Sequence, residues 1–89
     1  MVPFGEAVLL WRLERGLTQQ QLAKRAGVSR PNLSAIETGL RDASLRSVRA
    51  LALALDVRPG LLVDGIAPGE EEAKRGRSRA AMERISLRL

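Results

Sequence analysis

The sequence contains neither cysteine nor histidine. Without cysteine there are no disulfide bonds and no thiol chemistry, and without both residues there is no zinc finger. The absence of histidine also excludes catalysts that use an imidazole as acid or base. The carboxylates form no convincing metal site or acid–base pair. We therefore expect no enzyme, no metal and no cofactor.

Aromatic residues and long apolar runs are also scarce. Phe4 and Trp11 are the only aromatic residues, and the remaining apolar content is mostly Leu, Ala and Val, which favours a packed helical core over a sheet. The 89 residues suffice for one small domain and a tail. No apolar run approaches the roughly 18 residues of a membrane span. The first residues, MVPFGEAVLL, lack the basic flank and cleavage site of a signal peptide, so we expect a cytoplasmic protein.

Basic residues exceed acidic ones. The net charge is +5 and comes mainly from arginine. Such a balance favours a polyanionic partner without identifying it.

The most informative segment runs from Thr18 to Gly39, TQQQLAKRAGVSRPNLSAIETG. Thr18 and Gln21 have the spacing of a capping box, and Ser29 is a second N-cap, so two short helices are predicted. Gly27 can end the first helix because it adopts a left-handed conformation at no steric cost. Two short helices joined by such a turn form a helix-turn-helix pattern.

Three further helices are predicted around this segment. The first spans about Phe4 to Arg15, and a short last one opens at Arg58-Pro59-Gly60 and ends at Asp64-Gly65. Between them a helix capped by Ser44 should bury a stripe at spacings of three and four, namely Leu45, Val48, Ala52 and Leu55. The fold class is therefore all-α: a five-helix domain over residues 1–65 with an extension over residues 66–89.

The chain resembles the DNA-binding domain of the Cro and lambda-repressor type, the xenobiotic-response-element (XRE) family of bacterial and phage regulators. The resemblance covers Phe4 to Val63, through WRLERGLTQQQLAKRAGVSRPNLSAIETGLRDASLRSVRALALALDV and the following PGLL. It implies a lambda-repressor-like bundle whose second motif helix enters the major groove of double-stranded DNA. The chain has Ala43 where the family usually has Pro, and Asp56 where it usually has Gly. These departures concern turns rather than the binding face.

The resemblance places the base contacts on the exposed residues of the second motif helix. Arg30 is the best reader on chemical grounds because a guanidinium can donate two bonds to guanine O6 and N7. Alternatively, Arg30 contacts a phosphate or remains solvated. Asn32 can bond an adenine or a phosphate, and the small residues Ser34 and Ala35 allow close approach, for example to a thymine methyl group.

Phosphate contacts are expected on both sides of that helix. Gln19 matches the family position that bonds a phosphate and braces the recognition helix, and Thr38 and Arg41 follow in the next loop. Thr18 and Pro31 are further candidates, although a cap explains Thr18 and helix initiation is the preferred interpretation of Pro31. Gln19, Thr38 and Arg41 can otherwise be ordinary polar surface residues.

By analogy with phage repressors of this fold, Arg12 should pair with Glu37 near the end of the recognition helix. This pair would hold the motif against the rest of the bundle.

A contact surface for a dimer or a partner is predicted from apolar residues outside the motif: Leu9, Leu10, Leu13, Leu53, Met82, Ile85, Leu87 and Leu89. Clustered exposed leucines are less common than single ones. The alternatives are a first helix that is more enclosed than the pattern suggests, and a disordered tail.

Together these features predict a sequence-specific DNA-binding transcriptional regulator, a repressor that binds a palindromic operator as a homodimer and associates with the nucleoid when bound. One alternative is an antitoxin that represses its own operon while its terminal segment binds a toxin. Another is a protein-interaction module of the same fold that reads no DNA. No membrane partner is expected.

Overall fold

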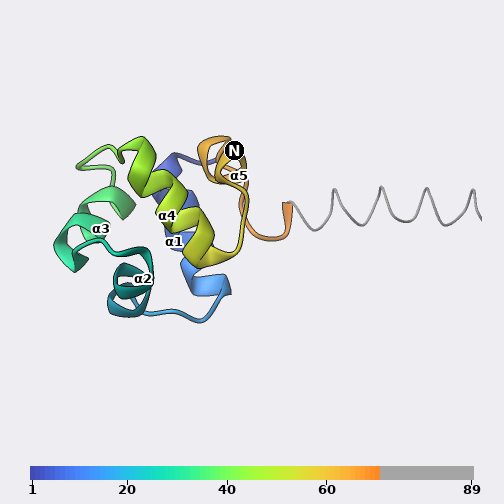
Figure 1. Cartoon of the computed structure of the whole chain (residues 1–89). Coiled ribbons are helices and arrows are strands. Elements are labelled where there is room, and N and C mark those ends of the chain that lie inside the picture. Colours follow the sequence, from blue (N-terminus) through green and yellow to red (C-terminus); the bar gives the residue numbers. More distant parts are fainter. Residues whose placement is uncertain (71–89) are drawn as a thin grey trace, which may run out of the picture.

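The computed structural model describes residues 1–70, and every regular element in that part of the chain is a helix. The helices are α1 (Phe4–Glu14), α2 (Gln19–Ala26), α3 (Arg30–Glu37), α4 (Leu45–Leu55) and α5 (Pro59–Val63). In Figure 1, α4 crosses in front of α1, with α2 and α3 on one side of this pair and α5 on the other. The predicted all-α, five-helix architecture is confirmed.

Short polar side chains determine where three of the helices begin. The Thr18 hydroxyl oxygen accepts a hydrogen bond from the Gln21 backbone N–H at 3.1 Å, and the Gln21 side-chain oxygen accepts one from the Thr18 N–H at 2.9 Å. This is the predicted capping box, which satisfies two backbone donors at the start of α2. Ser29 and Ser44 cap α3 and α4 through their hydroxyl oxygens.

Two left-handed residues end α2 and α4. Gly27 follows α2 with a φ of 69°, as the sequence predicts. Asp56 follows α4 with a φ of 57°, and within residues 1–70 it is the only non-glycine residue with a positive φ. Asp tolerates this conformation better than most residues with a Cβ, but a glycine would adopt it without steric cost. Asp56, which stands where the family usually has Gly, therefore raises the conformational free energy of this turn.

The core lies where all five helices meet. Its largest fully buried side chains are Val8, Trp11, Leu22, Leu33, Ile36, Leu51, Leu55 and Leu62. The predicted stripe on α4 was wrong at Leu45, which is 66% exposed, whereas Leu51 is fully buried. At 100° per residue, Leu45 points in nearly the same direction as the buried Ala52, so its direction on the helix does not explain its exposure. Leu45 is the first residue of α4, and the buried residues of the helix begin at Val48, one turn further on.

Trp11 joins the first helix to the chain that follows the last one. Its indole Nε1 donates a hydrogen bond of 2.8 Å to the Ile66 carbonyl, and the Arg15 guanidinium lies 4.9 Å from the centre of its ring. The Arg15 Nε also donates to the Leu55 carbonyl at 2.8 Å, which satisfies a free acceptor at the end of α4. Near the other end of α1, the Val2 N–H donates to the Gly65 carbonyl at 2.9 Å. These bonds fasten the C-terminal part of the domain to α1.

Gly5 permits α1 and α3 to approach closely. A Cβ at this position would overlap the carbonyl oxygen of Ile36 and lie 3.0 Å from that of Glu37. Both atoms belong to the backbone of α3, which cannot move aside as a flexible side chain can. The distance between α1 and α3 therefore depends on the absence of a side chain at Gly5.

We predict that Gly5→Ala lowers the free energy of unfolding by about 1–3 kcal/mol, the usual cost of overpacking a core. Urea denaturation measured by circular dichroism gives this value. Gly60→Ala is the matched control, because a Cβ at Gly60 in α5 would meet nothing within 4 Å. Equal stability of the two variants would contradict the close approach.

Candidate nucleic-acid interface

The two motif helices meet through a short turn, and α3 also packs against α1. Leu33, Ile36 and Glu37 form the buried side of α3. The first two residues of α3, Arg30 and Pro31, are exposed. The half-buried residues Asn32, Ser34 and Ala35 complete the accessible surface of the helix. All the residues predicted to contact bases thus lie on α3, outside its packed side.

The Glu37 carboxylate joins α3 to α1 and α2. Arg12 Nε donates to Glu37 Oε2 at 2.7 Å, and Arg12 Nη2 donates to Oε1 at 3.2 Å. Gln19 Nε2 also donates to Oε1, at 3.0 Å. The two charged side chains are only 11% and 3% exposed, so the pair is shielded from solvent. We call Arg12, Gln19 and Glu37 the carboxylate cluster.

The cluster satisfies the polar atoms that it buries. The remaining Arg12 nitrogen, Nη1, donates to the Leu17 carbonyl at 2.9 Å. Within residues 1–70, no buried side-chain nitrogen or oxygen lacks a hydrogen-bond partner. A buried ion pair needs such additional bonds to offset the cost of removing its charges from water. The predicted partners Arg12 and Glu37 therefore meet in a fully bonded arrangement.

The start of α2 carries donors that the fold leaves available. The Gln19 amide nitrogen has two hydrogens, and the bond to Glu37 uses one of them. Thr18 uses its hydroxyl oxygen as an acceptor in the cap, so its hydroxyl hydrogen can still be donated. The first backbone N–H groups of a helix are also free for an anion. Capping and anion binding are thus compatible at Thr18.

The loop after α3 is hydrogen-bonded back to the helix. The Thr38 hydroxyl donates to the carbonyls of Ser34 and Ala35 at 3.0 and 3.2 Å, so its hydrogen is already used. The Arg41 backbone N–H donates to the Ala35 carbonyl at 3.2 Å, and Arg41 Nη1 donates to Asn32 Oδ1 at 3.0 Å. The sequence does not predict this last bond, because the partners are nine residues apart and belong to different elements.

Arg30, unlike Arg41, has a side chain that is not held by a hydrogen bond within residues 1–70. Its side chain is exposed at the first position of α3, and no residue of the described part of the chain accepts a hydrogen bond from it. Its guanidinium can therefore be aimed by a ligand without first breaking an internal bond.

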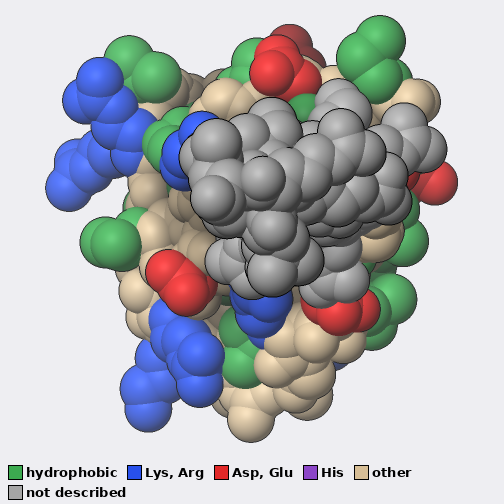
Figure 2. Space-filling view, turned by 90° about the vertical axis from the view of Figure 1, so that its right-hand side faces the viewer, with side chains coloured by type: hydrophobic (Ala, Val, Ile, Leu, Met, Phe, Trp, Pro, Cys, Tyr) green, Lys and Arg blue, Asp and Glu red, His purple; other side chains and the backbone are tan. Residues whose placement is uncertain are grey.

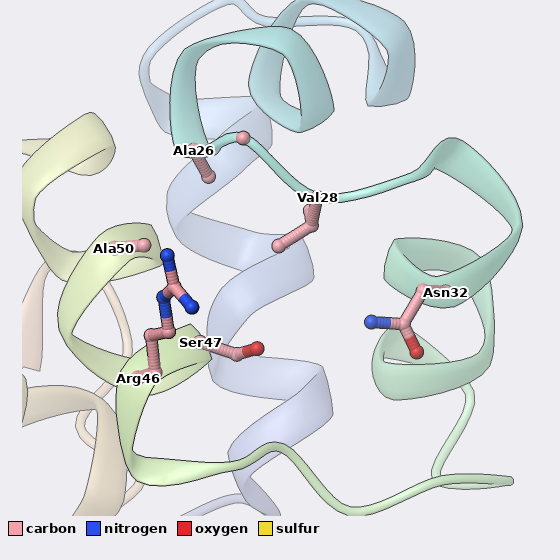
Figure 3. Close-up of a pocket in the computed structure, with 7 residues that line it drawn as sticks. Ala26, Val28, Asn32, Arg46, Ser47 and Ala50 are labelled. Atoms are coloured by element: carbon pink, nitrogen blue, oxygen red, sulfur yellow. The ribbon is translucent and has the colours of Figure 1, made fainter.

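A groove of about 470 Å³ separates the turn between α2 and α3 from α4. It is lined by Ala26, Gly27, Val28, Asn32, Arg46, Ser47 and Ala50. In Figure 3 the Asn32 amide reaches toward this groove from α3, and the Arg46 and Ser47 side chains extend into it from α4. One side of the recognition helix thus faces polar and basic side chains rather than open solvent.

The members of the predicted apolar contact surface that lie within residues 1–70 differ in exposure. Leu9 and Leu10 are only half-exposed, which corresponds to the more enclosed first helix that the sequence left as an alternative. Leu13 on α1 and Leu53 on α4 are 59% and 84% exposed. In the view from the side of α5, hydrophobic side chains around the rim are interspersed with charged ones (Figure 2). Met82, Ile85, Leu87 and Leu89 lie outside the described residues.

With this geometry established, comparison with known proteins identifies the family. The sequence profile of the helix-turn-helix family matches residues 9–62, which include α2, α3 and α4 in full. The chain belongs to the helix-turn-helix family. Its type is that of Cro and lambda repressor, in agreement with the resemblance found in the sequence.

Solved structures of similar proteins support this assignment. The restriction-modification controller protein C.AhdI from Aeromonas hydrophila is 37% identical with a TM-score of 0.65, over 66% of this chain and 89% of that one. SinR of Bacillus subtilis, the master regulator for biofilm formation, was solved with DNA and is 31% identical with a TM-score of 0.65, over 67% and 97% of the two chains. The P22 c2 repressor, solved with a synthetic operator, is 28% identical with a TM-score of 0.69, over 73% and 98%.

No curated protein sequence matches the chain. Among residues 1–70 there is no helix long and apolar enough to cross a membrane.

The carboxylate cluster predicts a large effect of Glu37→Ala. Removal of the carboxylate leaves Arg12 buried and unpaired, so the free energy of unfolding should fall by about 3 kcal/mol or more. Thermal and urea denaturation measure this loss. Glu14→Ala is the control, because it removes an exposed carboxylate from α1. If Glu37→Ala were as stable as that control, the cluster would not support the fold.

Proposed function

We propose that this helix-turn-helix protein represses transcription by binding a palindromic operator as a homodimer, and that it acts by binding alone, without catalysis. That it is a DNA-binding transcriptional regulator follows from its family and from the repressors and controllers that it resembles. The proposal of operator binding by a homodimer rests on how the two sides of α3 are arranged. The carboxylate cluster fixes its buried side, while its accessible side presents an unpaired arginine.

Reading of the bases is assigned mainly to Arg30. Its position at the first residue of α3 suits a motif in which the N-terminal residues of the recognition helix contact base edges. A bidentate bond to guanine O6 and N7 would make it specific for one base pair. Ser34 and Ala35 are small enough to let α3 lie close to the groove floor, and Pro31, which has no N–H, can contact DNA only through its ring.

Phosphate contacts would fix the domain on the duplex. We assign them to the start of α2, where Thr18 and Gln19 retain donors, and to the loop after α3, through Arg41. Thr38 contributes less, because its hydroxyl hydrogen is donated to α3. Such contacts position the protein without reading sequence.

The size of α3 argues for two copies. Its eight residues extend about 12 Å at 1.5 Å per residue, so one domain can read only a few base pairs. A homodimer on two half-sites would add the specificity of both helices. Among residues 1–70, Leu13 and Leu53 are the members of the predicted apolar surface that are exposed enough to take part in such a contact.

Selection from a random duplex pool tests the operator and the dimer together. We expect an enriched sequence with two-fold symmetry and half-site centres about one helical turn, roughly 10 base pairs, or a multiple of it apart. Binding to unselected duplex should weaken steeply as salt is added, because phosphate contacts release counterions. An asymmetric site would contradict the homodimer, and no enrichment at all would contradict sequence-specific binding.

We predict that Arg30→Ala abolishes the preference at one base pair of each half-site, a loss of about 1–3 kcal/mol of discrimination. Competition between the selected operator and single-base variants measures this preference. Arg25→Ala removes an exposed arginine from the last turn of α2 and serves as the control. A uniform weakening of all sequences by Arg30→Ala would instead indicate that Arg30 contacts a phosphate.

A further inference from the structure

The side of α1 that faces away from the core carries leucines, where a surface helix usually carries polar residues. At 100° per residue, Leu13 points within about 20° of Glu6. Leu9 and Leu10 lie on either side of Glu6, within about 60° of it, and the buried residues of the helix point the other way. Leu13 is exposed, and Leu9 and Leu10 are half-buried. We call these four residues the leucine face.

The charges on and beside the leucine face are negative. Glu6 and Glu14 are exposed, and neither carboxylate is paired within residues 1–70. The basic residues of this part of the chain are bonded elsewhere, since Arg12 is buried against the carboxylate cluster and Arg15 donates to the end of α4. A partner that fits this face should therefore combine apolar side chains with positive charges.

The sequence contains a segment of that composition after the described residues. Residues 79–89, RAAMERISLRL, include three arginines and a single glutamate, so the segment is net positive. Its large apolar residues belong to the contact surface predicted from the sequence, namely Met82, Ile85, Leu87 and Leu89. The segment thus complements the leucine face in charge as well as in apolar character.

The described chain leads back to α1 before this segment begins. Trp11 Nε1 donates to the Ile66 carbonyl at 2.8 Å, and the next two residues are half-buried. The eight residues 71–78 can span up to roughly 26–29 Å, whereas α1 is only about 16 Å long. The segment can therefore reach the whole leucine face of its own chain. A short tether also gives it a millimolar effective concentration there, which favours the same chain over a second copy in dilute solution.

We propose that residues 79–89 bind the leucine face of α1 in the same chain, with their arginines beside Glu6 and Glu14. Removal of the leucines from water supplies most of the stabilisation, because exposed ion pairs contribute little. The charges instead favour this face over the arginine-rich surfaces of the domain, which repel a basic segment. Leu13 is then covered, so Leu53 on α4 remains for a contact between two copies.

The absence of cysteine allows a single spin label to test this contact in the full chain. Ser86→Cys places the label among the apolar residues of the segment without removing one of them. We expect the label to broaden the backbone amide NMR signals of the leucine face more strongly than those of α2, α3 or α4. Equal broadening over all helices, or stronger broadening on another helix, would overturn the proposal.

Substitutions on α1 test which side chains hold the segment. In the spin-labelled chain, Leu13→Gln removes apolar surface and Glu6→Arg reverses a charge, so each should restore much of the lost signal intensity. Leu53→Gln is the matched control, because it changes an exposed leucine on α4 and should restore none. Broadening of α1 that survives Leu13→Gln unchanged would show that the leucine face is not the binding site. Circular dichroism melting checks that every variant is folded.

A mixture of two chains tests whether the segment binds its own domain. An isotope-labelled chain without the spin label is refolded together with a spin-labelled chain that carries no isotope. We expect no selective broadening in this mixture, because the contact lies within one chain. Broadening of the leucine face would instead place the segment of a second copy there, and the same-chain arrangement would be wrong. These measurements use no DNA, so their outcome is independent of the operator selection that tests the proposed function.

Discussion

The structure depends above all on one carboxylate. Glu37 is the last residue of the recognition helix, yet its side chain points inward and accepts bonds from α1 through Arg12 and from α2 through Gln19. The apolar contacts of α3 can be satisfied by small rotations and shifts, since hydrophobic attraction has no direction. Charge-assisted hydrogen bonds with fixed geometry remove that freedom. The carboxylate therefore specifies how α3 is oriented as well as where it lies.

The two hydrogens of the Gln19 side-chain amide show how support of α3 and recognition of DNA are combined in the motif. One N–H of the Gln19 amide is given to the Glu37 carboxylate, and the other lies on the residue that opens α2. A phosphate bound at that position would be linked through one side chain to the last residue of α3. Arg41 is arranged in a similar way on the other side of the helix, since it bonds Asn32 near the start of α3. Residues assigned to the phosphate backbone are thus themselves fastened to the recognition helix.

Much of this architecture could be predicted from the sequence because it is encoded locally. The capping residues and Gly27 fix helix boundaries within a few positions of themselves, and the helix-turn-helix spacing identifies the family. Contacts between residues that are far apart in the sequence could not be predicted from such local patterns. The crossing at Gly5 is set by the backbone of α3, which lies some thirty residues further along the chain. The bond between Asn32 and Arg41 depends on the path of the loop. The exposure of Leu45 depends on which turns of α4 pack against the other helices.

The chain has no tyrosine and a single tryptophan, Trp11, which is 2% exposed and bonded to the Ile66 carbonyl. Its intrinsic fluorescence therefore originates from one indole, and that indole belongs to α1 rather than to either motif helix. The emission wavelength responds to water reaching the ring, and so to the release of the chain after α5 from the core. Contacts made on the surface of α2 and α3 would leave the indole covered. The fluorescence of Trp11 therefore reports whether the core around α1 is intact, and not what is bound on the surface of α2 and α3.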